Sequence, residues 1–226
     1  METQEEKSSS FLKILGMGCL AVFILAGLGT WYVYKNIKNI GAEFVQKGAE
    51  RLLDETLLPD EDKNQLKLVF DEVVEDFKSG EINENEFGAI VESFSESGII
   101  PAMGLRFFEV TYLDKSNLPK QEIQEYAQIL SRYRWAVIQD KIASNIARYS
   151  EIIDIITIKK AETNEFKRSL NKEELKACIN IMEEVAELNN IPDQYYKINL
   201  AEEIRNVINR ARDKVKTKNN NSLEVQ

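Results

Sequence analysis

Histidine is absent from this chain, and cysteine, proline and glycine are scarce. The 226 residues include no His, two Cys, four Pro and ten Gly. Without histidine the chain lacks the side chain best suited to proton transfer near neutral pH, and it cannot form His-containing zinc sites or Ser-His and Cys-His nucleophile pairs. The few glycines and prolines are too few for the many turns of a β-sandwich or barrel. Those catalytic classes are excluded, and an all-β fold is disfavoured.

Common cofactor and nucleophile motifs are also absent. The sequence contains no GxGxxG, Walker-type lysine loop, GxSxG or CxxC pattern, so nucleotide cradles, nucleophile elbows and dithiol sites have no local signature. Cys19 lies inside an apolar run, which makes a disulfide with Cys178 implausible. Cys178 lies beside Ile179 and Met182, as a core residue would. We expect neither a cofactor nor a metal ion.

Positive charge is outnumbered. The formal net charge is −9 and the isoelectric point is about 4.9. A surface of that average sign repels phosphates, so no nucleic-acid partner is expected. The stretch SRYRWAVIQDK at 131–141 places aromatic rings among arginines, an arrangement that can stack on bases. The simpler interpretation is an interface or partly buried helix with cation–π packing.

An uncharged run of 21 residues, from Ile14 to Tyr34, reads ILGMGCLAVFILAGLGTWYVY. A helix of that length rises about 30 Å, the thickness of the hydrocarbon core of a bilayer. Aromatic residues and then Lys35 follow at its far end, as at a membrane–water interface. We therefore predict a single transmembrane helix over 13–35, and we assign to the span Ile14, Leu20, Phe23, Leu25, Trp31 and Tyr34.

The nature and orientation of this segment have alternatives. A cleaved signal peptide would carry a shorter apolar region, of roughly 7–15 residues, and a small-residue cleavage site, so a retained anchor fits better. Basic residues near the span are more numerous on its C-terminal side, which leans toward a cytoplasmic C-terminal domain. A domain on the opposite side is the alternative. The predicted localisation is the membrane, as a single-pass protein, and the lipid bilayer is the first expected partner.

The remaining chain is patterned for helices, so the predicted fold class is all-α. Leu66, Val69, Val73 and Phe77 recur at helical spacing after Pro59, which suits a helix start. A long helical stretch is predicted over 119–158; its β-branched end, IIDIITI, could also be a strand, but no partner strand is evident. The predicted divisions are a tail (1–12), the transmembrane helix (13–35), a helical stalk (36–58), a domain of five or six helices (59–217) and a disordered tail (218–226).

Residues 75–87, EDFKSGEINENEF, place a glycine, an apolar residue and a glutamate at the spacing of a calcium-binding loop. They fit a helical hairpin better. A calcium loop over 75–86 needs oxygen ligands at its first, third and fifth positions, and the third would be Phe77. As a hairpin, Gly80 ends one helix in a left-handed conformation. Asn83 and Glu86 form a capping box, and Ile82 with Phe87 forms a hydrophobic staple. The same cap pattern recurs at 170–175.

The stretch VFDEVVEDFKSGEINENEFGAI resembles the helix, G-x-I-[ST]-x-x-E-F turn and second helix of SHOCT-type modules, and the resemblance covers about 66–90. Such modules are short helical hairpins in bacterial proteins, often linked to membranes or oligomers, and the resemblance implies that role here. Here the stretch is mid-chain, and Gly88-Ala89 replaces the lysine-bearing continuation. The whole layout is similar to an uncharacterised bacterial family of single-pass, membrane-anchored helical proteins, which implies no activity.

The last predicted helix carries a local basic patch in an acidic protein. Its apolar face is formed by Ile204, Val207 and Ile208, among others. Anionic lipid headgroups are a plausible partner for the patch if the domain is cytoplasmic; a solvated helix end is the plainer explanation. The patch comprises Arg205, Arg210, Arg212, Lys214, Lys216 and Lys218.

Three functional hypotheses follow from these patterns. The first is a membrane-tethered helical interaction or scaffold protein, with a protein partner or self-association and no evident catalysis. The second is an enzyme of the hydrolase class that uses carboxylates, which predicts an apolar-walled cleft with two acids of raised pKa. The third is calcium binding through 75–86.

Overall fold

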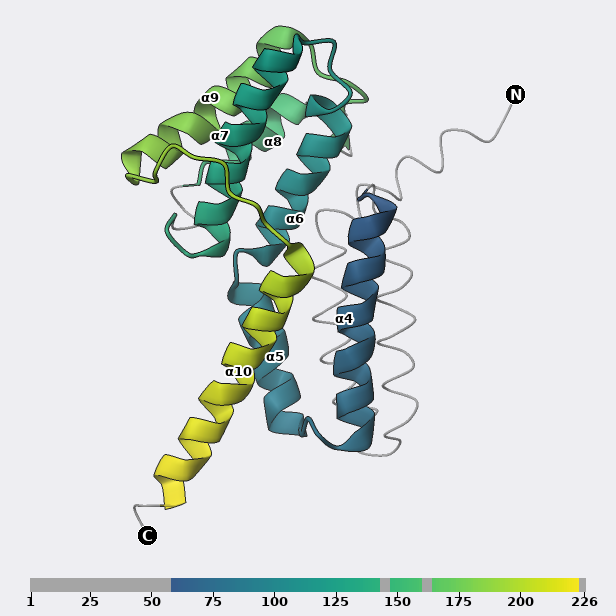
Figure 1. Ribbon diagram of the computed structural model, residues 1–226, viewed down its shortest axis with the longest axis vertical. Coiled ribbons are helices and arrows are strands. Elements are labelled where there is room, and N and C mark those ends of the chain that lie inside the picture. Colours follow the sequence, from purple (N-terminus) through teal and green to yellow (C-terminus); the bar gives the residue numbers. More distant parts are fainter. Residues whose placement is uncertain (1–57, 143–146, 160–163, 224–226) are drawn as a thin grey trace, which may run out of the picture. The chain divides into compact units, whose positions relative to one another are not determined.

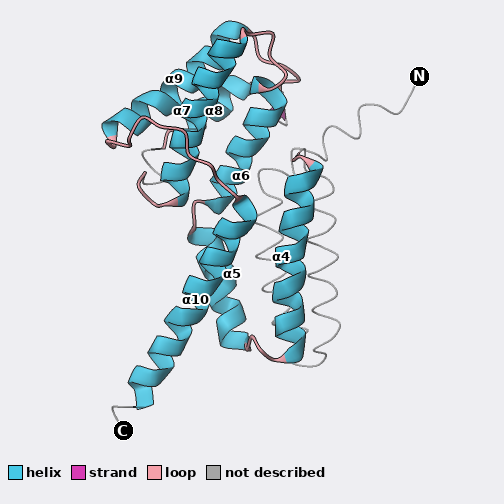
Figure 2. Cartoon of the chain, viewed as in Figure 1, coloured by secondary structure: helices cyan, strands magenta, loops and turns pink. Residues whose placement is uncertain are grey.

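The computed structural model describes residues 58–142, 147–159 and 164–223. Within these ranges the protein is mostly helical, with seven α-helices and two short strands (Figures 1 and 2). The all-α prediction is thereby confirmed in its coarse form. The predicted tail, transmembrane helix and stalk up to residue 57 lie outside the described residues. None of the helices in the described ranges is both long enough and apolar enough to span a bilayer.

The described chain forms two compact units, where the sequence predicted one domain over 59–217. The first unit is Gly98–Asn199, and the second joins the described residues before Gly98 to those from Leu200 onward. The second unit is therefore assembled from two segments that are separated in the sequence by the whole of the first unit.

Three helices build the second unit: α4 (Asp60–Ser79), α5 (Glu84–Glu96) and α10 (Leu200–Leu223). The helix α10 packs against both α5 and α4. The predicted apolar stripe of α4 is buried at Leu66, Val69, Val74 and Phe77, as its helical spacing requires. The helix α10 continues to Leu223. Its end lies beyond the predicted one at 217, so residues 218–223 are helical where a disordered tail was predicted.

The first unit contains the remaining elements (Figure 1). Its longest helices, α7 and α9, pack against each other, α6 packs on α7, and α8 packs on α9. The elements in chain order are α6 (Ile99–Phe108), the π-helical turn η1 (Glu109–Leu113), α7 (Lys120–Ile138), α8 (Tyr149–Ile156), β1 (Thr157–Lys159), β2 (Asn164–Phe166) and α9 (Lys172–Leu188).

The predicted continuous helix over 119–158 is wrong. The helix α7 ends at Ile138, and Asp140 adopts a left-handed φ of 51°. The run IIDIITI is helical only to Ile156; from Thr157 it is strand β1, which pairs antiparallel with β2. The partner strand reads Asn-Glu-Phe and is too short and too polar to be recognised from its sequence. Pairing with this strand makes 157–159 extended, although their apolar spacing favours a helix.

The aromatic and basic stretch in α7 belongs to the core of the first unit. Tyr133 is completely buried, and its hydroxyl donates a hydrogen bond to the Ala147 carbonyl. The buried guanidinium of Arg132 donates to the Ile191 carbonyl. The ring of Trp135 stacks on Tyr196, with centroids 4.4 Å apart. These contacts confirm the interpretation as a buried helix, although the ring partner of Trp135 is a tyrosine and not the predicted arginine. Cys178 is also fully buried, as predicted.

A buried charge cluster links η1 to α7. The Glu109 carboxylate accepts hydrogen bonds from Arg134 at 2.7 Å and from Arg106 at 2.8 Å. Burial alone would raise the pKa of Glu109, but the charge of Arg134 and the bonds from both guanidinium groups bring the pKa below its usual value. The Arg134 side chain is only 5% exposed, so it depends on this carboxylate for its charge balance.

Glu109→Gln is expected to destabilise the first unit by about 3 kcal/mol, because it leaves the buried Arg134 charge uncompensated. A lowered folded-state pKa means that the contribution of Glu109 is complete above its unfolded value near 4.5 and is lost as the pH falls through the folded value. The difference in the free energy of unfolding between wild type and Glu109→Gln should therefore become smaller below pH 4.5. Urea unfolding followed by Trp135 fluorescence, in a Trp31→Phe background, measures this.

The matched control for this variant is Glu187→Gln on α9, whose side chain is exposed. It makes the same charge change in the same unit and should alter stability by less than about 0.5 kcal/mol. Equal losses in both variants, or a difference that does not change with pH, would show that the Glu109 charge does not stabilise the fold.

Candidate functional site

The turn between α4 and α5 has the backbone geometry predicted from its sequence. Gly80 follows α4 with φ 86° and ψ 10°, a left-handed conformation that glycine adopts without steric cost. Its N–H donates to the Phe77 carbonyl at 3.3 Å, and the N–H of Ile82 donates to the Asp76 carbonyl at 3.0 Å. These bonds satisfy carbonyls that the end of a helix leaves free. Gly80 therefore ends α4, as predicted.

Asn83 and Glu86 form the predicted capping box at the start of α5. The Asn83 side-chain oxygen accepts from the N–H groups of Asn85 and Glu86, at 3.0 and 3.1 Å. In return, one carboxylate oxygen of Glu86 accepts from the Asn83 N–H at 3.0 Å and from its side-chain amide at 2.8 Å. Glu86 is only 4% exposed. A carboxylate that is held this way is a structural group of the turn.

Apolar side chains close the hairpin beneath these caps. Ile82 is 1% exposed, which agrees with its predicted place in the staple. The Phe87 ring contacts the Phe77 ring, with centroids 4.7 Å apart. A second ring pair, Phe70 and Phe94, joins the two helices farther from the turn at 6.4 Å. The contact with Phe77 was missed because it joins two helices, whereas staple rules concern one helix and its entry.

The calcium interpretation of 75–86 finds little support in this geometry. Residues 75–79 belong to α4, and Phe77, at the third ligand position, is buried. The Glu86 carboxylate is occupied by the capping box. Among the described residues no group of three or more acids or cysteines is placed to hold a metal ion.

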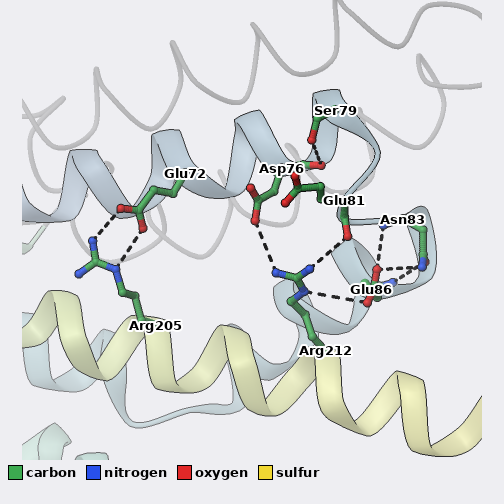
Figure 3. Close-up of polar contacts among 8 residues, drawn as sticks. All are labelled: Glu72, Asp76, Ser79, Glu81, Asn83, Glu86, Arg205 and Arg212. Carbon is green, nitrogen blue, oxygen red and sulfur yellow. Dashed lines mark hydrogen bonds and ion pairs between the residues drawn. The ribbon is translucent and has the colours of Figure 1, made fainter.

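Two arginines of α10 hold this hairpin through its acidic side chains, as Figure 3 shows. Arg205 donates to both carboxylate oxygens of Glu72, at 3.1 and 3.0 Å. Arg212 donates to the Glu81 carbonyl at 3.1 Å and to Asp76 at 3.5 Å, and it lies 4.0 Å from Glu86. We call this set, Asp76, Glu81, Glu86 and Arg212, the Arg212 cluster.

Some residues of the predicted basic patch contact the hairpin, and others do not. Arg205 and Arg212 are engaged with the hairpin. Arg210 is exposed and, within the described part of the chain, donates only to the Asn206 carbonyl of its own helix, at 3.3 Å. Lys214 and Lys216 are exposed and have no ion-pair partner among the described residues. Lys218 lies in α10, and its side chain is outside the described part.

The ion pairs to the hairpin were missed in the sequence, although a signal was present. Arg205 and Arg212 are seven residues apart, which places them on one face of α10. Glu72 and Asp76 are four residues apart, on one face of α4. Two matching rows of opposite charge on helices with apolar stripes indicate a pairing, but the sequence does not show which helices meet.

The described carboxylates of the first unit give little support to a carboxylate-dependent hydrolase. A groove of about 710 Å³ along α7 and α9 is lined by Glu122, Glu125, Glu183 and Asp193. The pKa of Glu122 lies below its usual value, mainly because Lys172 donates a hydrogen bond to it. Burial raises the pKa of Asp114, but Asp114 does not line this groove. An acid–base pair needs one carboxyl of raised pKa in the cleft itself.

No protein-family model, curated protein or solved structure matches this chain.

Asn83→Ala is expected to destabilise the hairpin by about 1 kcal/mol, because the N–H groups of Asn85 and Glu86 lose their acceptor. The measurement is hydrogen exchange of the α5 amides by mass spectrometry, in which the variant should exchange faster. Asn85→Ala, two residues later and at an exposed position, is the control and should change the exchange of these amides little. Comparable acceleration by both substitutions would mean that the cap contributes nothing specific.

Arg212→Ala is expected to cost roughly 1–3 kcal/mol, because the nearly buried Glu86 and the Glu81 carbonyl lose a charged partner. Arg210→Ala removes the same charge from the same helix at an exposed position and should cost less than about 0.5 kcal/mol. The stabilities of the two variants are compared by urea unfolding, followed by far-UV circular dichroism. Hydrogen exchange of α4 and α5 shows whether the loss is located in the hairpin. A larger loss in Arg210→Ala would contradict the role of the Arg212 cluster.

Proposed function

We propose that this protein is a membrane-tethered helical interaction or scaffold protein, anchored by a single transmembrane helix over 13–35. The observation that carries the proposal is the uncharged run from Ile14 to Tyr34, which ends in aromatic residues followed by Lys35. A segment of that length and composition matches the hydrocarbon core and the interface of a bilayer. The proposed localisation is the membrane, with the helical domain on the cytoplasmic side.

The basic surface of α10 supports a role near a membrane or a partner. Arg210, Lys214 and Lys216 are exposed, and the neighbouring arginines are already paired with the hairpin. On a cytoplasmic domain, each such cation close to anionic headgroups contributes about 1 kcal/mol of attraction. The paired arginines hold α10 to the hairpin, so the free cations are presented from a fixed helix.

The proposed role is binding and not catalysis. The chain has no histidine and no recognised nucleophile or nucleotide motif. The acids that line the groove along α7 and α9 include Glu122, whose lowered pKa favours the ionised form. The likeness of 66–90 to SHOCT-type hairpins supports a partner that is another protein or a second copy of this chain.

Charge insertion into the anchor tests the proposal. Leu20→Lys with Leu25→Lys places two charges at the centre of the span, at about 2.5–3.5 kcal/mol each, so the variant should leave the membrane fraction. Leu20→Ala with Leu25→Ala shortens the same side chains without charge and should stay in that fraction. The measurement is the distribution of full-length protein after alkaline carbonate extraction of cell membranes.

Two outcomes would count against the proposal. Wild-type protein in the soluble fraction would remove the anchor. Wild-type protein in the membrane fraction that forms no cross-linked species in intact cells, with itself or another protein, would remove the scaffold role. Protease treatment of sealed vesicles gives the orientation, because only a domain on the outer face of the vesicle is digested.

A further inference from the structure

A second depression in the first unit differs in charge from the rest of the protein. It has a volume of about 380 Å³ and lies between the segment 111–118, which leaves η1 and enters α7, and the segment 168–175, which starts α9. Among the described residues that line it, three are cationic, Lys115, Arg168 and Lys172, and none is acidic. The described lining of the groove along α7 and α9 is the reverse, with four acids and one lysine. In a chain of net charge −9, this concentration of cations is a local exception.

Two of these three cations have no ion-pair partner among the described residues. Lys172 is paired with Glu122 at 2.9 Å. Lys115 and Arg168 are exposed and have no ion-pair partner among the described residues. Lys115 and Arg168 therefore place two unpaired positive charges beside the depression, and clefts concentrate the field of such charges.

Two residues that line the depression carry hydroxyl groups without a hydrogen-bond partner among the described residues. The side-chain oxygens of Thr111 and Ser116 are shielded from solvent and have no hydrogen-bond partner among the described residues. Thr111 belongs to η1, a π-helical turn, and such turns are rare and occur often at functional sites. Buried hydroxyls are normally paired, so two unpaired ones beside one depression require an explanation.

The start of α9 adds further donors. Asn171 caps this helix and accepts from the N–H of Glu174 at 2.9 Å. The capping bond leaves the N–H groups of Lys172 and Glu173 to other acceptors, since the first N–H groups of a helix have no partner within it. The helix dipole favours negative charge at this end, where the first turn of α9 already carries Glu173 and Glu174.

We propose that this depression binds the phosphate group of a small molecule. Arg168 and Lys115 supply the charge that attracts a dianion, and the arginine fork fits two phosphate oxygens. A change of side-chain rotamer at Thr111 or Ser116 would bring its shielded hydroxyl to one of the remaining oxygens. Leu118, Leu170 and Leu175 line the same depression, so it accepts a small organic group attached to the phosphate. The volume is within the range of small-ligand sites.

The test uses full-length protein and inorganic phosphate as the probe, at constant ionic strength set with sodium chloride. Phosphorus NMR line broadening measures the dissociation constant. Wild type should bind saturably, and Arg168→Gln and Lys115→Gln should each weaken binding at least fivefold. Lys197→Gln, an exposed lysine of the same unit that does not line the depression, should change it less than twofold. Unchanged melting temperatures show that the variants are folded.

A second arm distinguishes the source of the phosphate. It compares glycerol 3-phosphate with dihexanoyl phosphatidic acid below its micelle concentration. Tighter binding of the lipid would support a headgroup ligand in the depression, and equal binding would support a soluble ester, provided that Arg168→Gln weakens both. Non-saturable binding, or binding that Arg168→Gln and Lys197→Gln weaken equally, overturns the proposal.

Discussion

The second unit depends on the burial of one apolar face, that of α10, against a hairpin from the other end of the described chain. The buried residues of α4 and α5 form stripes on two helices, and a pair of short helices alone leaves much of such a stripe in water. The helix α10 covers both. The salt links of Arg205 and Arg212 then fix which faces meet. The Arg205–Glu72 pair is exposed, so it selects the geometry more than it supplies stability, whereas Arg212 also serves as the charged partner of the nearly buried Glu86.

Local sequence rules predicted the hairpin closely and the long-range contacts poorly. The positions of Gly80, Asn83 and Glu86 follow from caps that involve neighbours within a few residues, which a sequence displays directly. The ends of α7 and the strand pair β1–β2 depend on partners elsewhere in the chain. Residues 152–158 have a continuous apolar period, yet the backbone changes state within it because β2 supplies hydrogen bonds to it. The sequence around 152–158 does not indicate that such a partner strand exists.

The candidate sites were predictable to different degrees. The basic residues of α10 are visible in the sequence, but their division into paired arginines and free lysines depends on the packing of α10. The cationic depression was not predictable at all, because Lys115 and Arg168 are isolated in the sequence and meet through the fold. The arginines of 131–141 illustrate the opposite case: Arg132 and Arg134 have the composition of a binding surface, and the fold uses them inside the core.

The discontinuous second unit has a consequence for synthesis on the ribosome. The hairpin is complete once Ser97 has been made, but its covering helix begins only at Leu200. At a synthesis rate of about 5–20 residues per second, the apolar faces of α4 and α5 wait roughly 5–20 seconds for their partner. That interval is the time in which the first unit, which is contiguous in sequence, is itself synthesised. The capping box and the Phe77–Phe87 contact are then the interactions available to hold the hairpin in a form that α10 can recognise.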